Sequence, residues 1–148
     1  MYSDKITLFN FYSSSLGDMW YPHIIENVNL LIDKAAIVSK YGAESKDNAI
    51  LNIKFTKRDS QILIDEKPYF SPLEWEQQTN DKLADSITFS PGNEFDFFML
   101  GEFPELNPIF DDDYDGLFNY VKENYDYVFA ITSVAKYDVI PHFEITGK

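Results

Sequence analysis

The sequence predicts a mainly β domain of the α+β kind, in which a small antiparallel β-barrel or sandwich carries two short helices and long loops. Three observations support this fold class. Several short segments alternate apolar and polar residues with a period of two, as half-buried strands do. Aromatic residues make up 17% of the 148 residues, and Phe and Tyr favour strands. Pro, Gly, Asn and Asp separate these segments, as expected for turns between strands.

The clearest strand is Leu51-Asn52-Ile53-Lys54-Phe55-Thr56, where every second residue is apolar. Near the end of the chain, residues 127–134 and 139–146 flank residues 135–138, a spacing typical of an antiparallel hairpin with a four-residue loop. Similar alternation occurs in two further segments, at Val28, Leu30 and Ile32 and at Ile87 and Phe89, and also within the second hairpin segment, at Phe143 and Ile145.

Two short helices are expected to close the end or side of the barrel. Ser71-Pro72-Leu73-Glu74 places a helix N-cap, a proline in the first turn and a capping-box glutamate in register, so that Trp75 faces the core. The second helix covers about residues 115–124. Its apolar stripe, at helical spacing, consists of Tyr114, Leu117, Phe118 and Val121.

Between these helices the chain is expected to make a long excursion over the surface. Pro91-Gly92 and residues 101–108 are acidic and rich in turn residues, and they enclose the apolar run 95–100, which is interrupted only by Asp96. Residues 36–48 are expected to form a loop or a weak helix. No internal repeat or composition break marks a second domain, so we expect one domain over residues 1–148.

Charge and composition exclude several function classes. The net charge of −13 argues against non-specific nucleic-acid binding, which needs clustered Lys and Arg. Residues 1–58 hold six acids and seven bases, and residues 59–148 hold nineteen acids and five bases. We therefore expect subunit contacts from the near-neutral first third, with the acidic remainder facing solvent or a channel. The chain has no cysteine, which excludes disulfides and thiolate chemistry, and no signal-peptide core or bilayer-length apolar run, so we expect no export and no membrane partner.

The motif Asp111-x-Asp113-x-Asp115-Gly116 matches the first half of a calcium loop. The second half does not match, because Lys122 stands where the bidentate glutamate belongs. The alternative is that these acids cap the helix that follows and that their negative charges interact favourably with the positive N-terminal end of its dipole. We expect no metal site, although whether this loop binds a cation stays open.

No catalytic, cofactor-binding or metal-ligating residue is predicted, and the protein is not expected to be an enzyme. The sequence has no metalloprotease, serine-hydrolase, dinucleotide or P-loop spacing, and no spacing supports an acid-pair hydrolase. His142 is expected to face solvent or an interface, and Ser13-Ser14-Ser15 reads as a turn. The aromatic segments Trp20-Tyr21-Pro22 and 95–98 have two open interpretations, as interface anchors or as irregular strands in the core.

A set of motifs spread along most of the chain resembles an uncharacterised family of small phage and prophage proteins of Gram-positive bacteria, similar to head-tail connector and minor capsid proteins. The motifs are Ile6-Thr7-Leu8-Phe9-Asn10, Trp20-Tyr21-Pro22, Lys40-Tyr41-Gly42, Lys67-Pro68-Tyr69 before Trp75, Ile87-Thr88-Phe89-Ser90-Pro91, Ile131-Thr132-Ser133-Val134 and Ile140-Pro141-His142-Phe143-Glu144-Ile145.

This resemblance implies a small β-barrel that assembles as a homo-oligomeric ring between capsid and tail. The partners would be other phage structural proteins, the portal and the tail, and the locations would be the virion and the host cytoplasm during assembly. The implied function is that of a head-tail connector, or head-closure, protein of the neck. The alternative is an acidic phage-encoded inhibitor that imitates nucleic acid, which would need carboxylates arranged in duplex-like rows.

Overall fold

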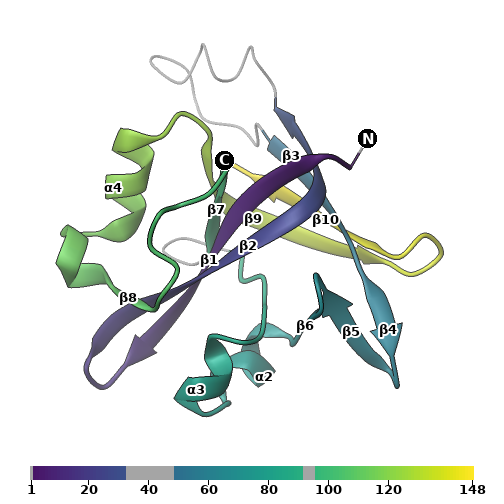
Figure 1. Ribbon diagram of the computed structural model, residues 1–148, viewed down its shortest axis with the longest axis horizontal. Helices are drawn as coiled ribbons and strands as arrows, with labels where there is room; N and C mark the ends of the chain where they lie inside the picture. Colours follow the sequence, from purple (N-terminus) through teal and green to yellow (C-terminus); the bar gives the residue numbers. More distant parts are fainter. Residues whose placement is uncertain (1, 33–48, 92–95) are drawn as a thin grey trace.

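The computed structural model describes residues 2–32, 49–91 and 96–148. Within them, antiparallel strands close into a barrel in the order β1-β7-β9-β10-β3-β2, and the pairing of β2 with β1 completes the ring (Figure 1). The mainly β prediction is therefore confirmed, in its barrel form. The bounds are β1 Asp4–Ser14, β2 Gly17–Ile32, β3 Ala49–Lys54, β7 Phe97–Leu100, β9 Val128–Tyr137 and β10 His142–Gly147.

The hairpin of β1 and β2 is the longest element of the barrel. Its register runs from Asp4 opposite Val28 to Ser14 opposite Gly17, and its turn projects beyond the barrel at the lower left of Figure 1. The last residues of β2 leave β1 and pair with β3, with Asn29 opposite Asn52. Asn27 has a positive φ of 57° close to this change of partner. One long strand therefore serves both sides of the barrel, which allows the sheet to close.

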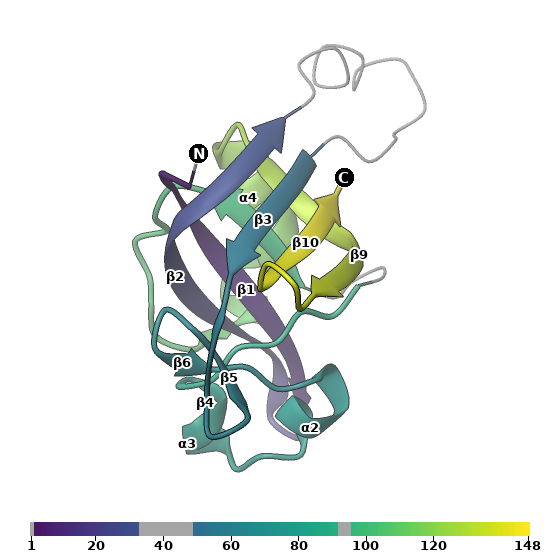
Figure 2. The same cartoon turned by 90° about the vertical axis from the view of Figure 1, so that its right-hand side faces the viewer.

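A second, small sheet lies below the barrel in Figure 2, and two short helices follow it in the chain. Its strands are β4 Thr56–Arg58, β5 Gln61–Ile64 and β6 Lys67–Pro68. The turns Asp59-Ser60 and Asp65-Glu66 have positive φ at both residues, the backbone of a type I′ hairpin turn. The helices that follow are α2 Pro72–Glu76 and α3 Asn80–Leu83.

Helix α2 confirms the predicted capping box. The Ser71 hydroxyl lies 2.9 Å from Glu74 Oε1 and accepts the Glu74 backbone N–H at 3.5 Å. Trp75 is buried, as expected, and packs against Tyr21 and Leu83. Helix α3, which the sequence analysis did not predict, spans only four residues. None of the helices in the described residues is both long and apolar enough to cross a membrane.

Two apolar cores lie on opposite faces of the same strands. The interior of the barrel holds the first core, with Leu8 and Phe98 among its buried residues. Helix α4 (Leu117–Asn124) covers the outside of the barrel and forms a second core with Phe9 and Phe97, whose rings stack at 4.4 Å. Strands buried on both faces are apolar at consecutive positions instead of alternating.

This double burial overturns the predicted surface excursion. The run 95–100 contains strand β7, in which Phe97, Phe98 and Met99 are buried, and Asp96 just before it is fully buried. Phe95 lies outside the described residues, as does the expected loop at 36–48. The acidic segment 101–108 does run over the outside of the barrel, and it ends in β8 Ile109–Phe110, which pairs with β2.

The other predicted elements are confirmed in place or with shifts. Strand β3 has Leu51, Ile53 and the following Phe55 buried, as predicted. The C-terminal hairpin exists with a four-residue loop, but the loop is residues 138–141 because β9 continues to Tyr137. The expected strand at Ile87 and Phe89 is wrong: both side chains are buried, yet the segment makes a single parallel bridge, from Ile87 to Tyr69.

Candidate functional site

Among the described residues, the most deeply buried carboxyl group is that of Asp96, just before β7. Its carboxylate accepts the backbone N–H of Phe11 at 2.8 Å, that of Ser90 at 2.9 Å and the side-chain amide of Asn10 at 2.8 Å. The Asn10 amide also donates to the Thr88 carbonyl at 2.7 Å. Burial raises the pKa of Asp96 to about 7, although these three donors favour the carboxylate. Because the network is sealed inside the protein, it joins β1 to the irregular segment 86–90 and serves the fold.

A second buried polar pair joins the barrel to the small sheet. His23 of β2 is almost fully buried, and its Nδ1 lies 3.0 Å from Nζ of Lys67 in β6. Among the described residues, His23 Nε2 has no hydrogen-bond partner. Burial and the neighbouring ammonium lower the pKa of His23 to about 3, and burial also lowers that of Lys67. The histidine is therefore neutral at physiological pH and is inaccessible to a substrate.

One aspartate of the calcium-like motif, Asp111, hydrogen-bonds the first residue of helix α4. Residues 111–114 form the short 3-10 helix η1, and Asp115 and Gly116 adopt positive φ values of 53° and 103°. One Asp111 carboxylate oxygen accepts the Leu117 N–H at 2.8 Å and the Trp20 indole N–H at 2.9 Å. In the described part of the chain, no three His, Asp or Glu side chains gather as metal ligands. The capping interpretation is confirmed for Asp111 alone, because the N-cap position itself is Gly116, which has no side chain to cap the helix.

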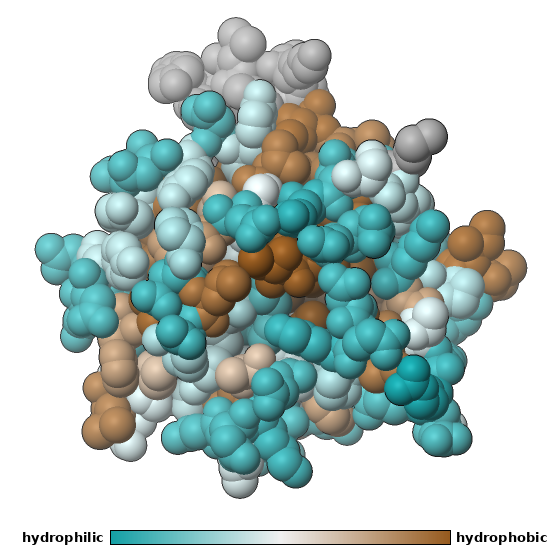
Figure 3. All heavy atoms as spheres, viewed as in Figure 1, coloured by the Kyte–Doolittle hydropathy of each residue, from teal (hydrophilic) through white to brown (hydrophobic). Residues whose placement is uncertain are grey.

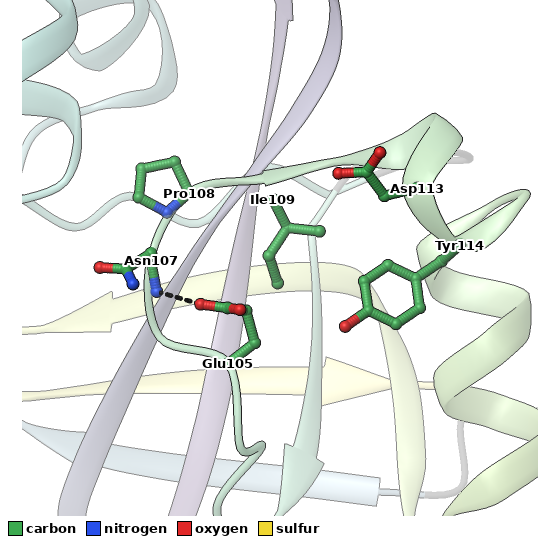
Figure 4. A pocket seen from close by; sticks show the side chains of 6 residues that line it. All are labelled: Glu105, Asn107, Pro108, Ile109, Asp113 and Tyr114. Carbon is green, nitrogen blue, oxygen red and sulfur yellow. Dashed lines mark hydrogen bonds between the residues drawn. The ribbon is translucent and has the colours of Figure 1, made fainter.

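A polar hollow lies next to this cap, between the segment 105–109 and η1 (Figure 4). We call it the β8 hollow. Its volume is about 460 Å³, and its lining consists of Glu105, Asn107, Pro108, Ile109, Asp113 and Tyr114.

The β8 hollow combines an apolar floor with an acidic rim. Ile109 is buried beneath it, and the Tyr114 ring faces it from η1 while Glu105 and Asp113 lie on its two sides (Figure 4). Burial and the nearby Glu105 carboxylate raise the pKa of Tyr114, so its hydroxyl stays protonated. Residues 101–126 around the hollow hold eight acids and one base. Such a site suits a cationic or mixed apolar and cationic group.

The opposite end of the molecule carries an apolar projection. We define the hairpin tip as Asp138, Val139, Ile140 and Pro141, the loop between β9 and β10. Val139 is 98% exposed and Ile140 is 73% exposed, and a hydrophobic group stands out at the right-hand end of the space-filling view (Figure 3). Other strongly exposed apolar side chains among the described residues are Leu16, at 83%, in the β1–β2 turn, and Leu73, at 63%, on α2.

Comparison with protein families identifies this chain over its whole length. Residues 1–148 match the model of a family of unknown function, DUF6751. The chain belongs to this family. No match was found among the curated proteins or among the solved structures. Because the function of the DUF6751 family is unknown, membership does not assign a chemistry to the chain.

The structure also shows where the aromatic, histidine and serine residues singled out in the sequence analysis lie. In this DUF6751 member Trp20 and Tyr21 are buried within β2, so their interpretation as anchors of an exposed loop is wrong. His142 is half-buried and its ring stacks on Tyr137 at 4.9 Å, at the base of the hairpin tip. The predicted turn at Ser13-Ser14-Ser15 is confirmed only at Ser15, because Ser13 and Ser14 are the last residues of β1; the Ser14 hydroxyl donates to the Gly17 carbonyl at 2.6 Å.

The hairpin tip and the β8 hollow were both missed by the sequence analysis. A signal for the tip existed, since Val139-Ile140-Pro141 places two apolar residues next to a turn-forming proline. We assigned those residues to a strand because they continue the apolar pattern of Phe143 and Ile145. The hollow had no signal along the chain, because it forms only when segment 105–109 packs beside η1.

Proposed function

We propose that the protein is a non-catalytic assembly component of a tailed-phage virion or prophage, acting at the neck as a head-tail connector or head-closure protein. The motif resemblance supports this role, and a compact barrel with projecting hairpins is compatible with it. The observation that carries the proposal is the exposure of Val139 and Ile140 on a projecting turn. Large apolar side chains that are exposed to water add little to the stability of the fold, and covering them with a partner protein is favourable.

The arrangement of the ionisable groups supports a role without catalysis. A catalytic acid or base must reach its substrate, and a perturbed pKa in an open cleft is its usual mark. Asp96 and His23 have the two largest pKa shifts among the described residues, and both are buried away from solvent. Their positions suit structural roles at the junctions between elements.

The charge distribution suits a position near packaged DNA. The eight acids of residues 101–126 lie in a surface segment, in η1 and around α4. An acidic surface repels a passing duplex and leaves it free to move. A nucleic-acid mimic would instead present carboxylates in two regular rows, whereas most of these acids lie in a short helix and irregular segments.

The test uses a phage or prophage that encodes the chain. The gene is disrupted, and particles are restored with the wild-type protein or with a variant carrying Val139→Ser and Ile140→Ser. We expect the null and the tip variant to yield filled heads without tails by electron microscopy. Leu73→Ser, at a 63% exposed position on α2, is the matched control and should restore infectious particles.

Normal, infectious particles from the null would reject the neck role. In that case, a location of the gene among early genes and binding of the purified protein to a DNA-binding enzyme would favour the inhibitor alternative.

A further inference from the structure

The hairpin tip and the β8 hollow lie at opposite ends of the protein. In Figure 1, where the longest axis is horizontal, the β9–β10 turn is at the right-hand end, and β8 and α4 are on the left. One molecule therefore cannot place its own tip in its own hollow. Two molecules placed end to end can bring the tip of one to the hollow of the other, and a rotation between them allows a ring to close.

The hairpin tip is held in a defined conformation. The Pro141 carbonyl accepts the Phe55 N–H at 3.3 Å, and His142 Nδ1 lies 2.7 Å from the Ile140 carbonyl oxygen. The stacked rings of Tyr137 and His142 clamp the base of the loop. A projection that is already ordered loses little conformational entropy when it binds.

The tip and the hollow are complementary in charge. Lys57 Nζ lies 3.8 Å and Lys136 Nζ 3.9 Å from the same Asp138 carboxylate oxygen, so these three side chains carry a net positive charge beside Val139. The rim of the β8 hollow carries Glu105 and Asp113. Opposite charges around an apolar contact fix its orientation and reject like-charged alternatives.

The tip and the hollow also both present apolar side chains. Val139 and Ile140 project as a small apolar knob, and the hollow offers Pro108, buried Ile109 and the Tyr114 ring. A knob of two side chains buries far less than the roughly 1,600 Å² of a standard stable complex. The contact is therefore weak for one pair of molecules and is strengthened when a ring or a template raises the effective concentration.

We infer that the hairpin tip of one molecule docks in the β8 hollow of a second copy of this chain, with Val139 and Ile140 against Ile109 and Tyr114. The interface is heterologous: different surfaces meet, and each molecule keeps one free tip and one free hollow. Repetition of such a contact closes a ring or extends a chain of subunits. This inference rests on the proposed function, for which it specifies the contact between subunits. It places that contact within residues 59–148, and not in the near-neutral first third from which the sequence analysis expects it.

The test exploits the absence of cysteine from the chain. One protein carries Val139→Cys at the tip, and another, distinguished by an affinity tag, carries Asn107→Cys at the hollow; both positions are exposed. A short bismaleimide should join the two proteins when they are mixed. We expect a yield of mixed dimer at least roughly tenfold above that of a control pair, Val139→Cys with Leu73→Cys, because the control pair meets only by random collision.

A charge exchange tests the orientation. Lys136→Glu on the tip protein should reduce the yield several-fold, and Asp113→Lys on the hollow protein should restore it, because the exchange inverts both charges. Both residues are exposed, so neither substitution disturbs the core. A mixed yield no higher than that of the control pair, or a charge exchange that restores nothing, would overturn the inference.

The two experiments can reject the contact between copies and the neck role separately. If the purified proteins do not cross-link and the tip reacts instead with a portal or tail protein in particles, the contact between copies is wrong and the neck role stands. If the copies cross-link as expected and the protein is absent from particles, the contact stands and the neck role is wrong.

Discussion

The buried pair of His23 and Lys67 makes acid sensitivity a measurable property of this fold. The pKa of His23 is about 3 in the folded protein, against an ordinary value of 6.5 in the unfolded chain. At His23 the folded state therefore binds fewer protons than the unfolded chain, and the contribution of His23 to stability falls as the pH drops below 6.5. Each pH unit of separation corresponds to about 1.36 kcal/mol, so between pH 7.5 and 4.5 His23 removes about 3 kcal/mol of stability.

The assay is urea unfolding at half-unit steps from pH 4.5 to 7.5, on the wild type and on His23→Gln. Glutamine keeps a polar side chain next to Lys67 but does not titrate. We expect the free energy of unfolding of the wild type, measured relative to the variant, to fall by about 3 kcal/mol towards pH 4.5. Parallel pH profiles of the two proteins would show that His23 is protonated equally in both states, and the argument from burial would fail.

Three further substitutions test the network, the helix cap and the packing. Asp96→Asn should remove the loss of stability that the wild type suffers as the pH rises from about 3.8 to 7, since the pKa of Asp96 is raised to about 7 in the folded state. The cost of an amide that cannot accept from all three donors, about 1–3 kcal/mol, should therefore be largest below about pH 4, by urea unfolding at both ends of this pH range. Asp111→Ala should cost about 1–2 kcal/mol by urea unfolding through loss of the α4 cap, whereas Asp113→Ala should be neutral, and millimolar calcium should leave both melting temperatures unchanged. Gly147→Ala should cost about 1–3 kcal/mol in the same assay, because its Cβ would lie 2.8 Å from that of Phe129; a neutral result would show that β10 shifts easily.

Strands with one solvent face could be predicted from the sequence, and strands with two buried faces could not. In β3 the polar residues Asn52 and Lys54 alternate with core residues, so the period of two is visible. In β7, α4 covers the outer face, so Phe97, Phe98 and Met99 are buried in succession and no period remains. Alternation reports burial on one face only.

Asp96 misled the sequence analysis for a related reason. A carboxylate beside an apolar run usually marks the surface, because burying a charge without partners is costly. Here two backbone N–H groups and the Asn10 amide accommodate it. Those donors come from β1 and from Ser90, and nothing in the order of the residues places β1 beside Asp96.

The helices were predictable because their signals are local. The capping box at Ser71 and the stripe containing Leu117 and Val121 involve residues within a few positions of one another. The hairpin tip and the β8 hollow depend on contacts between distant segments or on the exact end of a strand. The candidate site therefore required the structure, while the fold class did not.

The presence of the protein in mature particles tests the central claim most directly. Virions are purified through two density gradients, and the protein is quantified by mass spectrometry against the portal protein of the same particles. A neck ring predicts several copies per particle, in a fixed ratio to the portal that does not change between gradients. Absence from the particles, or a ratio that falls with each purification step, would contradict the assignment to the neck.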